Sequence, residues 1–223
     1  MWPVNARSPE HDAEIVASQW RVRWHDYLPA TGLVIALVLA WLGQRGWGGM
    51  AAWGVSADAL ARGRYETIVL HLFAHGGSLH LLMNSLALIE IGGLVTARLG
   101  SLEGGWARLL AAYGLSGLSS MIFFLSFHPQ GAVPMIGASG AIYGLVGLLL
   151  SIRLIDEIDL VELRDLPQAV VRFIQDNLFF LFLLLTSAAI AGLAGGMAWE
   201  AHLGGFLFGL CAGPWLTPPL QSR

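Results

Sequence analysis

Long apolar runs alternate with short polar stretches along most of the chain. A helix that crosses the hydrocarbon core of a bilayer takes roughly 17–25 mostly apolar residues, and fewer where its flanks help. Six runs approach or reach that length, and each predicts a membrane-spanning helix. They cover residues 28–43, 79–97, 106–127, 135–152, 178–196 and 199–216. The pattern predicts an all-α polytopic membrane protein, a bundle of six transmembrane helices.

The runs follow one another without an intervening soluble module, which favours one membrane domain over residues 28–216. Residues 1–27 are expected to form a short cytosolic or interfacial segment, and residues 217–223 a tail. The loop 44–64 carries Trp47 and Trp53 with few charges, which is typical of a segment lying partly in the membrane interface. The loop 153–176 carries nine charges and is expected to be a solvated connector with some helix.

Composition agrees with a membrane protein, because 56% of the residues are hydrophobic and only 12% are charged. A soluble domain has about a quarter charged residues. No basic stripe suggests a nucleic-acid partner, and the lipid bilayer is the expected environment. The single cysteine, Cys211, excludes an internal disulfide and is expected to pack within the last run.

All 12 basic residues are arginines, and their distribution predicts an orientation. With the N-terminus in the cytosol, nine arginines lie inside and three, Arg45, Arg62 and Arg64, lie outside. This excess agrees with the positive-inside rule. Six spans then leave both termini in the cytosol.

Polar side chains within the spans gather at one predicted depth. His80 and Asn84 come at the start of the second span, Ser139 at the start of the fourth and His202 at the start of the sixth. Even-numbered spans all run from outside to inside in this orientation, so the three groups share the outer part of the bilayer. Polar groups in hydrocarbon are costly and mark functional sites.

These residue types suit acyl transfer. A serine hydroxyl becomes a strong nucleophile when a histidine takes its proton, so Ser139 is the candidate nucleophile and His202 the candidate base. His80 and Asn84 are spaced i, i+4 and share a helix face, from which both side chains can donate to an oxyanion. The backbone N–H of Ser139 would be a further donor at a helix N-terminus.

Glycine spacing predicts which helices approach closely. Gly140 and Gly144 are four residues apart in the fourth span, and Gly205, Gly209 and Gly213 repeat that interval in the sixth. Small residues at this spacing let helix backbones come together. If the two glycine stripes meet, Ser139 and His202 reach hydrogen-bond distance; ordinary helix packing around structural glycines is the alternative.

Other intramembrane chemistries lack their residues. The chain contains no lysine for a Ser–Lys dyad and no H-E-x-x-H zinc motif. Every aspartate lies outside the predicted spans, which leaves no aspartyl pair. His71, His75 and His80 lie near one another in sequence, but only Glu66 could join them as a further metal ligand. Serine chemistry remains.

Four segments together resemble the rhomboid family of intramembrane serine proteases. They are His71-x3-His75-x4-His80-x3-Asn84; Gly92-Gly93 with Arg98-Leu99-Gly100; Gly137-Ala138-Ser139-Gly140-Ala141-Ile142-Tyr143-Gly144; and Ala201-His202-Leu203-Gly204-Gly205 with Gly209. They occur in the family's order and cover most of residues 64–213. The ordered set is far more specific than a lone G-x-S-G.

The resemblance implies an intramembrane serine endopeptidase of the six-helix rhomboid-like fold, with a Ser139–His202 dyad, an acyl-enzyme, and no cofactor or metal. His80, Asn84 and the Ser139 amide would form the oxyanion hole. Tyr143 would stack beside His202, His75 would be a structural polar residue, and Gly137 belongs to the nucleophile motif. Gly205 and Gly209 would admit the sixth helix to the fourth. Substrates would be single-span membrane proteins cleaved near the outer surface.

Two residues depart from this pattern. The family often has Trp-Arg in the first outer loop, where this chain has Gly63-Arg64 followed by Tyr65. Glu90 lies midway along the second span and has no assigned role; it either hydrogen-bonds across helices or faces a wet cavity.

Two other functions compete with proteolysis. One is a catalytically inactive relative that binds membrane clients, although such relatives typically lose the serine or histidine that this chain keeps. The other is a small transporter, for which repeated broken helices would be expected. The expected location is a multi-pass protein of a bacterial inner membrane, with the site towards the periplasmic side; an organelle membrane is the alternative.

Overall fold

The computed structural model describes residues 21–160, residue 171 and residues 198–218. Within these ranges the chain is helical, with one isolated β-bridge. The helices are η1 (Trp24–Tyr27), α2 (Leu28–Gln44), α3 (Gly49–Trp53), α4 (Ala57–Ala61), α5 (Thr67–Leu70), α6 (Ser78–Arg98), α7 (Gly105–Phe127), α8 (Ser139–Leu160) and α11 (Trp199–Leu216).

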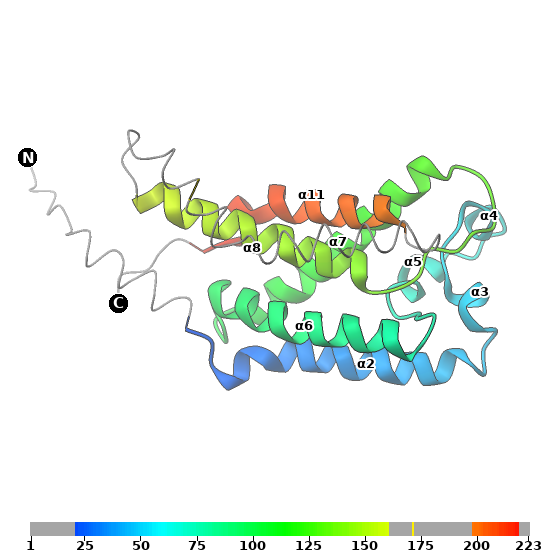
Figure 1. Cartoon of the computed structure of the whole chain (residues 1–223), viewed down its shortest axis with the longest axis horizontal. Coiled ribbons are helices and arrows are strands. Elements are labelled where there is room, and N and C mark those ends of the chain that lie inside the picture. The colour runs from blue at the N-terminus through cyan, green and yellow to red at the C-terminus, as the bar shows by residue number, and fades with distance from the viewer. Residues whose placement is uncertain (1–20, 161–170, 172–197, 219–223) are drawn as a thin grey trace, which may run out of the picture.

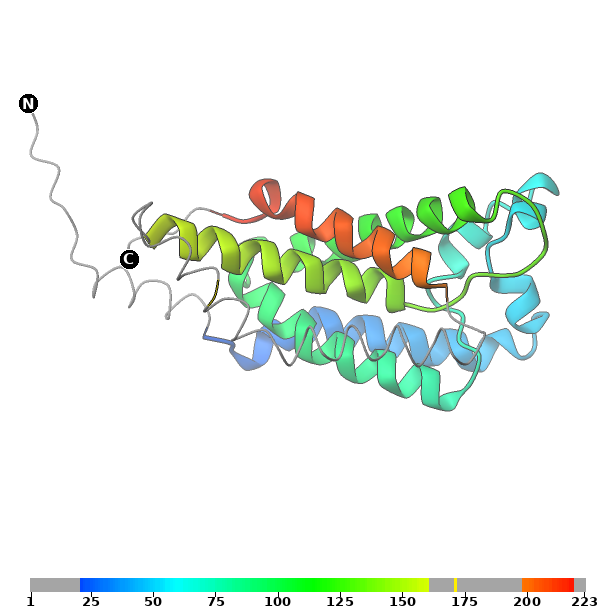
Figure 2. The same cartoon turned by 45° about the horizontal axis from the view of Figure 1, so that its top comes forward.

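The long helices lie side by side as a bundle (Figures 1 and 2). Helices α6, α8 and α11 begin at the same end of the bundle, where α2 and α7 finish. The short helices α3, α4 and α5 gather there too, and we call this end the loop end. The predicted common direction of the second, fourth and sixth spans is confirmed. Each of these three helices therefore presents its first turn, with His80, Ser139 or His202, at the loop end.

Three helical segments are long and apolar enough to cross a membrane: Trp24–Gln44, Ser78–Arg98 and Gly105–Phe127. The part of α8 over Ser139–Leu154 is apolar but shorter. The sequence prediction of helical spans is confirmed for these segments. The fifth predicted span, 178–196, lies outside the described residues, so the count of six and the orientation stay predictions.

One predicted boundary was wrong. The fourth span was expected from residue 135, but α8 begins at Ser139, because Met135 is extended and Gly137 has a φ of +107°, which no helix contains. The connector over residues 153–176 was expected to contain some helix, and α8 continues into it as far as Leu160. Apolar composition marks what crosses the bilayer, and a helix can extend past that limit with charged residues.

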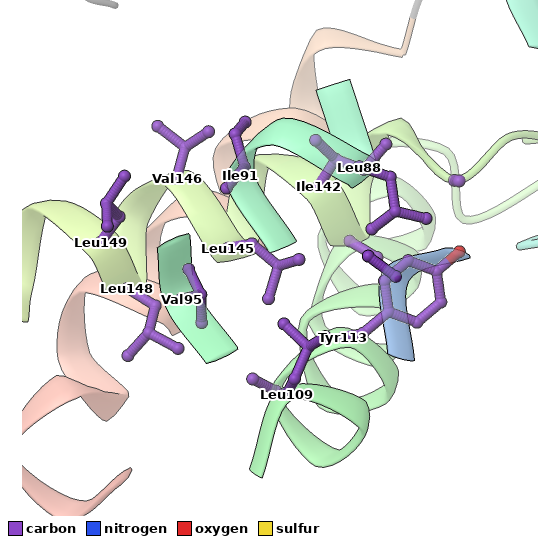
Figure 3. Packing of buried hydrophobic residues seen from close by; sticks show 14 of the residues in the cluster. Leu88, Ile91, Val95, Leu109, Tyr113, Ile142, Leu145, Val146, Leu148 and Leu149 are labelled. Atoms are coloured by element: carbon purple, nitrogen blue, oxygen red, sulfur yellow. The ribbon is translucent and has the colours of Figure 1, made fainter. Parts of the chain in front are cut away.

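Buried side chains from α6, α7 and α8 form the core of the bundle (Figure 3). On α6 the core residues Leu88, Ile91 and Val95 recur at the spacing of one helix face, as do Ile142 and Leu145 on α8. Leu109 and Tyr113 of α7 close the core from a third side (Figure 3). This core fixes the relative depth of the three helices and therefore of their first turns.

Helices α8 and α11 touch through their backbones. A Cβ atom on Gly209 would overlap the carbonyl oxygen of Gly144, and one on Gly205 would overlap that of Gly140. The predicted meeting of the two glycine stripes is confirmed. Gly147 joins the contact, because a Cβ there would overlap the carbonyl oxygen of Phe206. Only glycine allows this approach over two helix turns.

The connections at the loop end are tied to each other. Val55 and Met135 exchange two backbone hydrogen bonds of 3.1 and 2.8 Å, and Asp58 N–H donates to the carbonyl of Gly131 at 3.1 Å. Gly137 N–H donates to the carbonyl of His71 at 2.8 Å. The segment before Ser139 is therefore held by the connection between α2 and α6.

Arg64 stabilises the connection between α2 and α6. Its guanidinium donates to the carbonyls of Ala51 and Ala52 at the end of α3. Gly63, at the position that departs from the Trp-Arg pattern of the resembled family, has a φ of +78°, a value that favours glycine. In the predicted interfacial loop, Trp47 is 76% exposed, whereas Trp53 is buried at 9%.

The opposite end of the bundle has its own polar link. Asp26 of η1 is 1% exposed and accepts a hydrogen bond from the hydroxyl of Ser101 in the turn between α6 and α7. Arg98 at the end of α6 donates to the carbonyl of Pro218 at 3.2 Å.

The expected packing of Cys211 was wrong, because this cysteine is exposed on α11. Glu90 is likewise exposed on α6.

Replacing Gly209 with valine is expected to lower the unfolding temperature strongly, because the side chain must displace the backbone of Gly144. Overpacking of this kind costs about 1–3 kcal/mol or more. Gly114→Ala on α7 is the matched control, since nothing lies within 4 Å of its added Cβ. Thermal unfolding in detergent makes the comparison; equal stability of the two variants would contradict the backbone contact.

Stability is expected to fall between about pH 6.5 and pH 4 because of His71, which is fully buried. Burial lowers the pKa of His71 from 6.5 to about 4, so below pH 6.5 the unfolded chain binds a proton that the folded chain refuses. Thermal unfolding of wild type and His71→Phe from pH 7.5 to 4.5 tests this. The variant should lose less stability over that range, and an unchanged pH dependence would contradict the assignment.

Candidate functional site

Ser139 is the first residue of α8 and is half-buried at the loop end. The turn before it depends on Gly137, whose φ of +107° disfavours other residues. A Cβ atom on Gly137 would also stand 2.8 Å from Cε1 of His80. Gly137 therefore permits both the turn into α8 and the close approach of the His80 ring.

His202 and Ser139 lie in direct contact. Nε2 of His202 is 2.8 Å from Oγ of Ser139, although 63 residues separate them in sequence. Because a serine hydroxyl can donate and an unprotonated imidazole nitrogen can accept, this geometry allows the proton of Ser139 to pass to His202. The structure thus brings together the two residues that the glycine stripes predicted to be neighbours.

The other face of the His202 ring is fixed by packing. The rings of Tyr143 and His202 are stacked, with centroids 4.3 Å apart and planes 13° apart. Nδ1 of His202 is buried and has no hydrogen-bond partner among the described residues. When Nε2 accepts from serine, Nδ1 carries the hydrogen of the neutral ring. No acidic third member of a triad lies at Nδ1 within the described part of the chain.

The first turn of α6 supplies the remaining polar groups. His80 lies against Gly137, and Asn84 is 7% exposed one turn further along the helix. Nδ2 of Asn84 would lie 3.7 Å from a Cβ placed on Gly137. Both predicted donors therefore lie beside the turn that carries Ser139.

His75 lies behind these donors rather than beside the serine. Its Nε2 is 2.9 Å from Nδ2 of Asn84, and its ring meets that of His80 edge to face with centroids 4.9 Å apart. The family resemblance implied only a structural role for His75, and sequence analysis did not identify its partner. Among the described residues, no group of three histidine, cysteine or carboxylate side chains is arranged to hold a metal ion.

Sequence analysis missed two buried polar residues near the site. Gln44, the last residue of α2, hydrogen-bonds the backbone of His75. Glu200 is 7% exposed, and its carboxylate is 4.0 Å from Nε2 of His128, whose ring stacks on Phe124. Gln44 was missed because a polar residue at the end of an apolar run indicates only the boundary of a span. Glu200 was missed because its spacing from the His202 motif predicts no partner.

Comparison with known proteins gives a family match. The family model described as Rhomboid domain matches residues 62–219, which include every residue named above for the site except Gln44. The rhomboid protease GluP of Bacillus subtilis is 33% identical over 159 residues, 70% of this chain and 29% of its own length. RHOMBOID-like protein 5 of Arabidopsis thaliana is 33% identical over 142 residues, 64% of this chain and 41% of its own.

RHOMBOID-like protein 6, mitochondrial, of Arabidopsis thaliana is 31% identical over 155 residues, 70% of this chain and 45% of its own length. The chain thus spans less than half the length of these curated relatives. Since the matched region covers most of the chain and contains apolar helices long enough to span a bilayer, the protein is an integral membrane protein. On these findings the chain belongs to the rhomboid family.

Proposed function

We propose that this chain is an intramembrane serine endopeptidase that cleaves transmembrane segments of other membrane proteins near the outer face of the bilayer. The observation that carries the proposal is the 2.8 Å contact between Oγ of Ser139 and Nε2 of His202 at the loop end of the bundle. Membership of the rhomboid family supports it, and one relative bears the name of a protease.

The first step is attack of Ser139 on a peptide carbonyl. As the O–C bond forms, Nε2 of His202 takes the hydroxyl proton and acts as general base. Tyr143 holds the imidazole plane by stacking, so that Nε2 stays directed at Oγ. The glycine contacts of Gly205 and Gly209 with α8 hold the two helices, and therefore the two reacting atoms, at this separation.

The tetrahedral intermediate carries a negative oxygen that needs donors. Ser139 begins α8, so its backbone N–H is one of the unpaired groups of a helix N-terminus and lies at the positive end of the helix dipole. The side chains of His80 and Asn84 border the same turn through Gly137. We assign these three groups to the oxyanion hole.

Collapse of the intermediate breaks the peptide bond and leaves an acyl-enzyme on Ser139. The departing amine takes the proton from His202, and a water molecule then attacks the ester with His202 again as base. Both halves of the reaction use side chains of this chain, the backbone N–H of Ser139 and water. The partners are therefore membrane-protein substrates and the bilayer that presents them.

The arginine distribution supports an outward-facing loop end, with both termini in the cytosol. A bacterial inner membrane is the location we propose. The alternative is an organelle membrane, since one relative is named as mitochondrial. Localisation of the tagged chain in its own cells distinguishes the two.

Cleavage of a model single-span substrate by the purified protein should require both members of the dyad. We expect Ser139→Ala and His202→Ala to reduce kcat by roughly 10³-fold or more, because either change removes the nucleophile or its base. Gel analysis of the products in proteoliposomes gives the rates.

Ser126→Ala is the matched control for these variants, since its exposed hydroxyl bonds only the carbonyl of Ile122 in its own helix, and it should cleave at the wild-type rate. Cleavage that persists in Ser139→Ala would refute the serine mechanism. A folded wild type that neither cleaves nor reacts with a fluorophosphonate at Ser139 would favour the client-binding alternative.

Water must reach Ser139 from outside if the acyl-enzyme is to hydrolyse. In a Cys211→Ala background, Ser139→Cys should be labelled in intact cells by a polar, membrane-impermeant thiol reagent. Glu103→Cys, exposed in the turn at the opposite end, is the matched control and should stay unlabelled until the cells are lysed. Labelling of Glu103→Cys alone would reverse the proposed orientation.

A further inference from the structure

The peptide of His75 is held by one buried side chain from a distant helix. Gln44, the last residue of α2, is 4% exposed. Its Nε2 donates to the carbonyl of His75 at 2.6 Å, and its Oε1 accepts from the N–H of the same residue at 3.1 Å. Both polar ends of the amide are therefore used on a single residue, 31 positions further along the chain.

The ring of His75 has a defined hydrogen position. Nδ1 lies 3.1 Å from the carbonyl oxygen of Phe73, which can only accept, so Nδ1 carries the hydrogen. Burial, together with the nearby ring of His80, lowers the pKa of His75 to about 4, and the ring is neutral near pH 7. Nε2 is then a lone-pair acceptor.

That acceptor orients the side chain of Asn84. Nδ2 of Asn84 is 2.9 Å from Nε2 of His75 and must donate one of its two hydrogens there. The contact also shows that the nitrogen of the Asn84 amide, and not its oxygen, faces His75. An oxygen there would be repelled by the lone pair of Nε2. Among the described residues this nitrogen has no second acceptor, and its other N–H lies beside Gly137 and the turn into Ser139.

We propose that Gln44 and His75 are positioning residues that aim the free N–H of Asn84 at the oxyanion formed on Ser139. The inference rests on the proposed function and adds to it a residue of α2, which supplies none of the reacting groups. An unanchored asparagine amide rotates and can present its oxygen to a developing negative charge. The relay from Gln44 through the His75 peptide and ring removes that freedom before the substrate arrives, which is how oxyanion donors gain their strength.

The test is a double-mutant cycle between Gln44→Met and Asn84→Ala, measured as kcat and KM on the model substrate. Gln44→Met keeps the length of the side chain and loses both hydrogen bonds. Alone, it should lower kcat about 10–100-fold with KM unchanged, a fraction of the roughly 10²–10³-fold effect of losing an oxyanion donor. In the Asn84→Ala background it should change kcat less than about twofold, because the relay acts only through Asn84.

Ser85→Ala is the matched control for a structural effect. Its buried hydroxyl, one residue from Asn84, donates to the carbonyl of Leu81 at 2.8 Å, a bond within its own helix that is not part of the relay. It should lower the unfolding temperature without lowering kcat. If Gln44→Met reduces kcat by the same factor with and without Asn84, its role is structural and the proposal is overturned.

A second measurement tests the relay without catalysis, so that it is separable from the proposed function. In ¹⁵N-labelled protein, one side-chain N–H of Asn84 should exchange with solvent slowly, and Gln44→Met should abolish that protection. Unchanged protection in Gln44→Met overturns the relay whatever the enzyme cleaves. Intact protection in a wild type that cleaves nothing would leave the relay standing and refute the endopeptidase.

Discussion

The contact between the backbones of α8 and α11 is the constraint on which the site depends. Gly140 and Gly144 face Gly205 and Gly209 so closely that a single methyl group on the latter pair would overlap a carbonyl oxygen. Lipid chains are as apolar as the side chains they contact, so helices in a bilayer associate through close packing more than through the hydrophobic effect. The 2.8 Å approach of Ser139 to His202 is a product of that packing.

Much of the helical framework could be predicted because long apolar runs in a membrane protein mark the segments that cross the bilayer. Runs of apolar residues located α2, α6, α7 and α11 to within a few residues. The same signal misplaced the start of α8, since Met135 is apolar but pairs with Val55 in an extended conformation. It also could not resolve α3, α4 and α5, which are four or five residues long and depend on local caps such as the Ser56 hydroxyl at α4.

The candidate site divides in the same way. The proximity of Ser139 and His202 was predictable, because glycines spaced four residues apart mark the helix faces that approach each other closely. The contact between Gln44 and His75 was not predictable. Gln44 bonds only the backbone of His75, and every residue has the same backbone, so no sequence pattern marks the contact. Glu200 and His128 pair at 4.0 Å through a contact between the ends of α7 and α11 that spacing does not encode either.

Helix α2 is anchored at both of its ends. At one end Asp26 of η1 accepts from Ser101, and at the other Gln44 holds His75. The continuous segment Trp24–Gln44 has 21 residues, about 30 Å of helix, which matches the hydrocarbon thickness of an average bilayer. A thinner or thicker bilayer changes the preferred tilt of such a helix. Because both ends of α2 are hydrogen-bonded to neighbouring connections, a change in the tilt of α2 would bear directly on the peptide of His75.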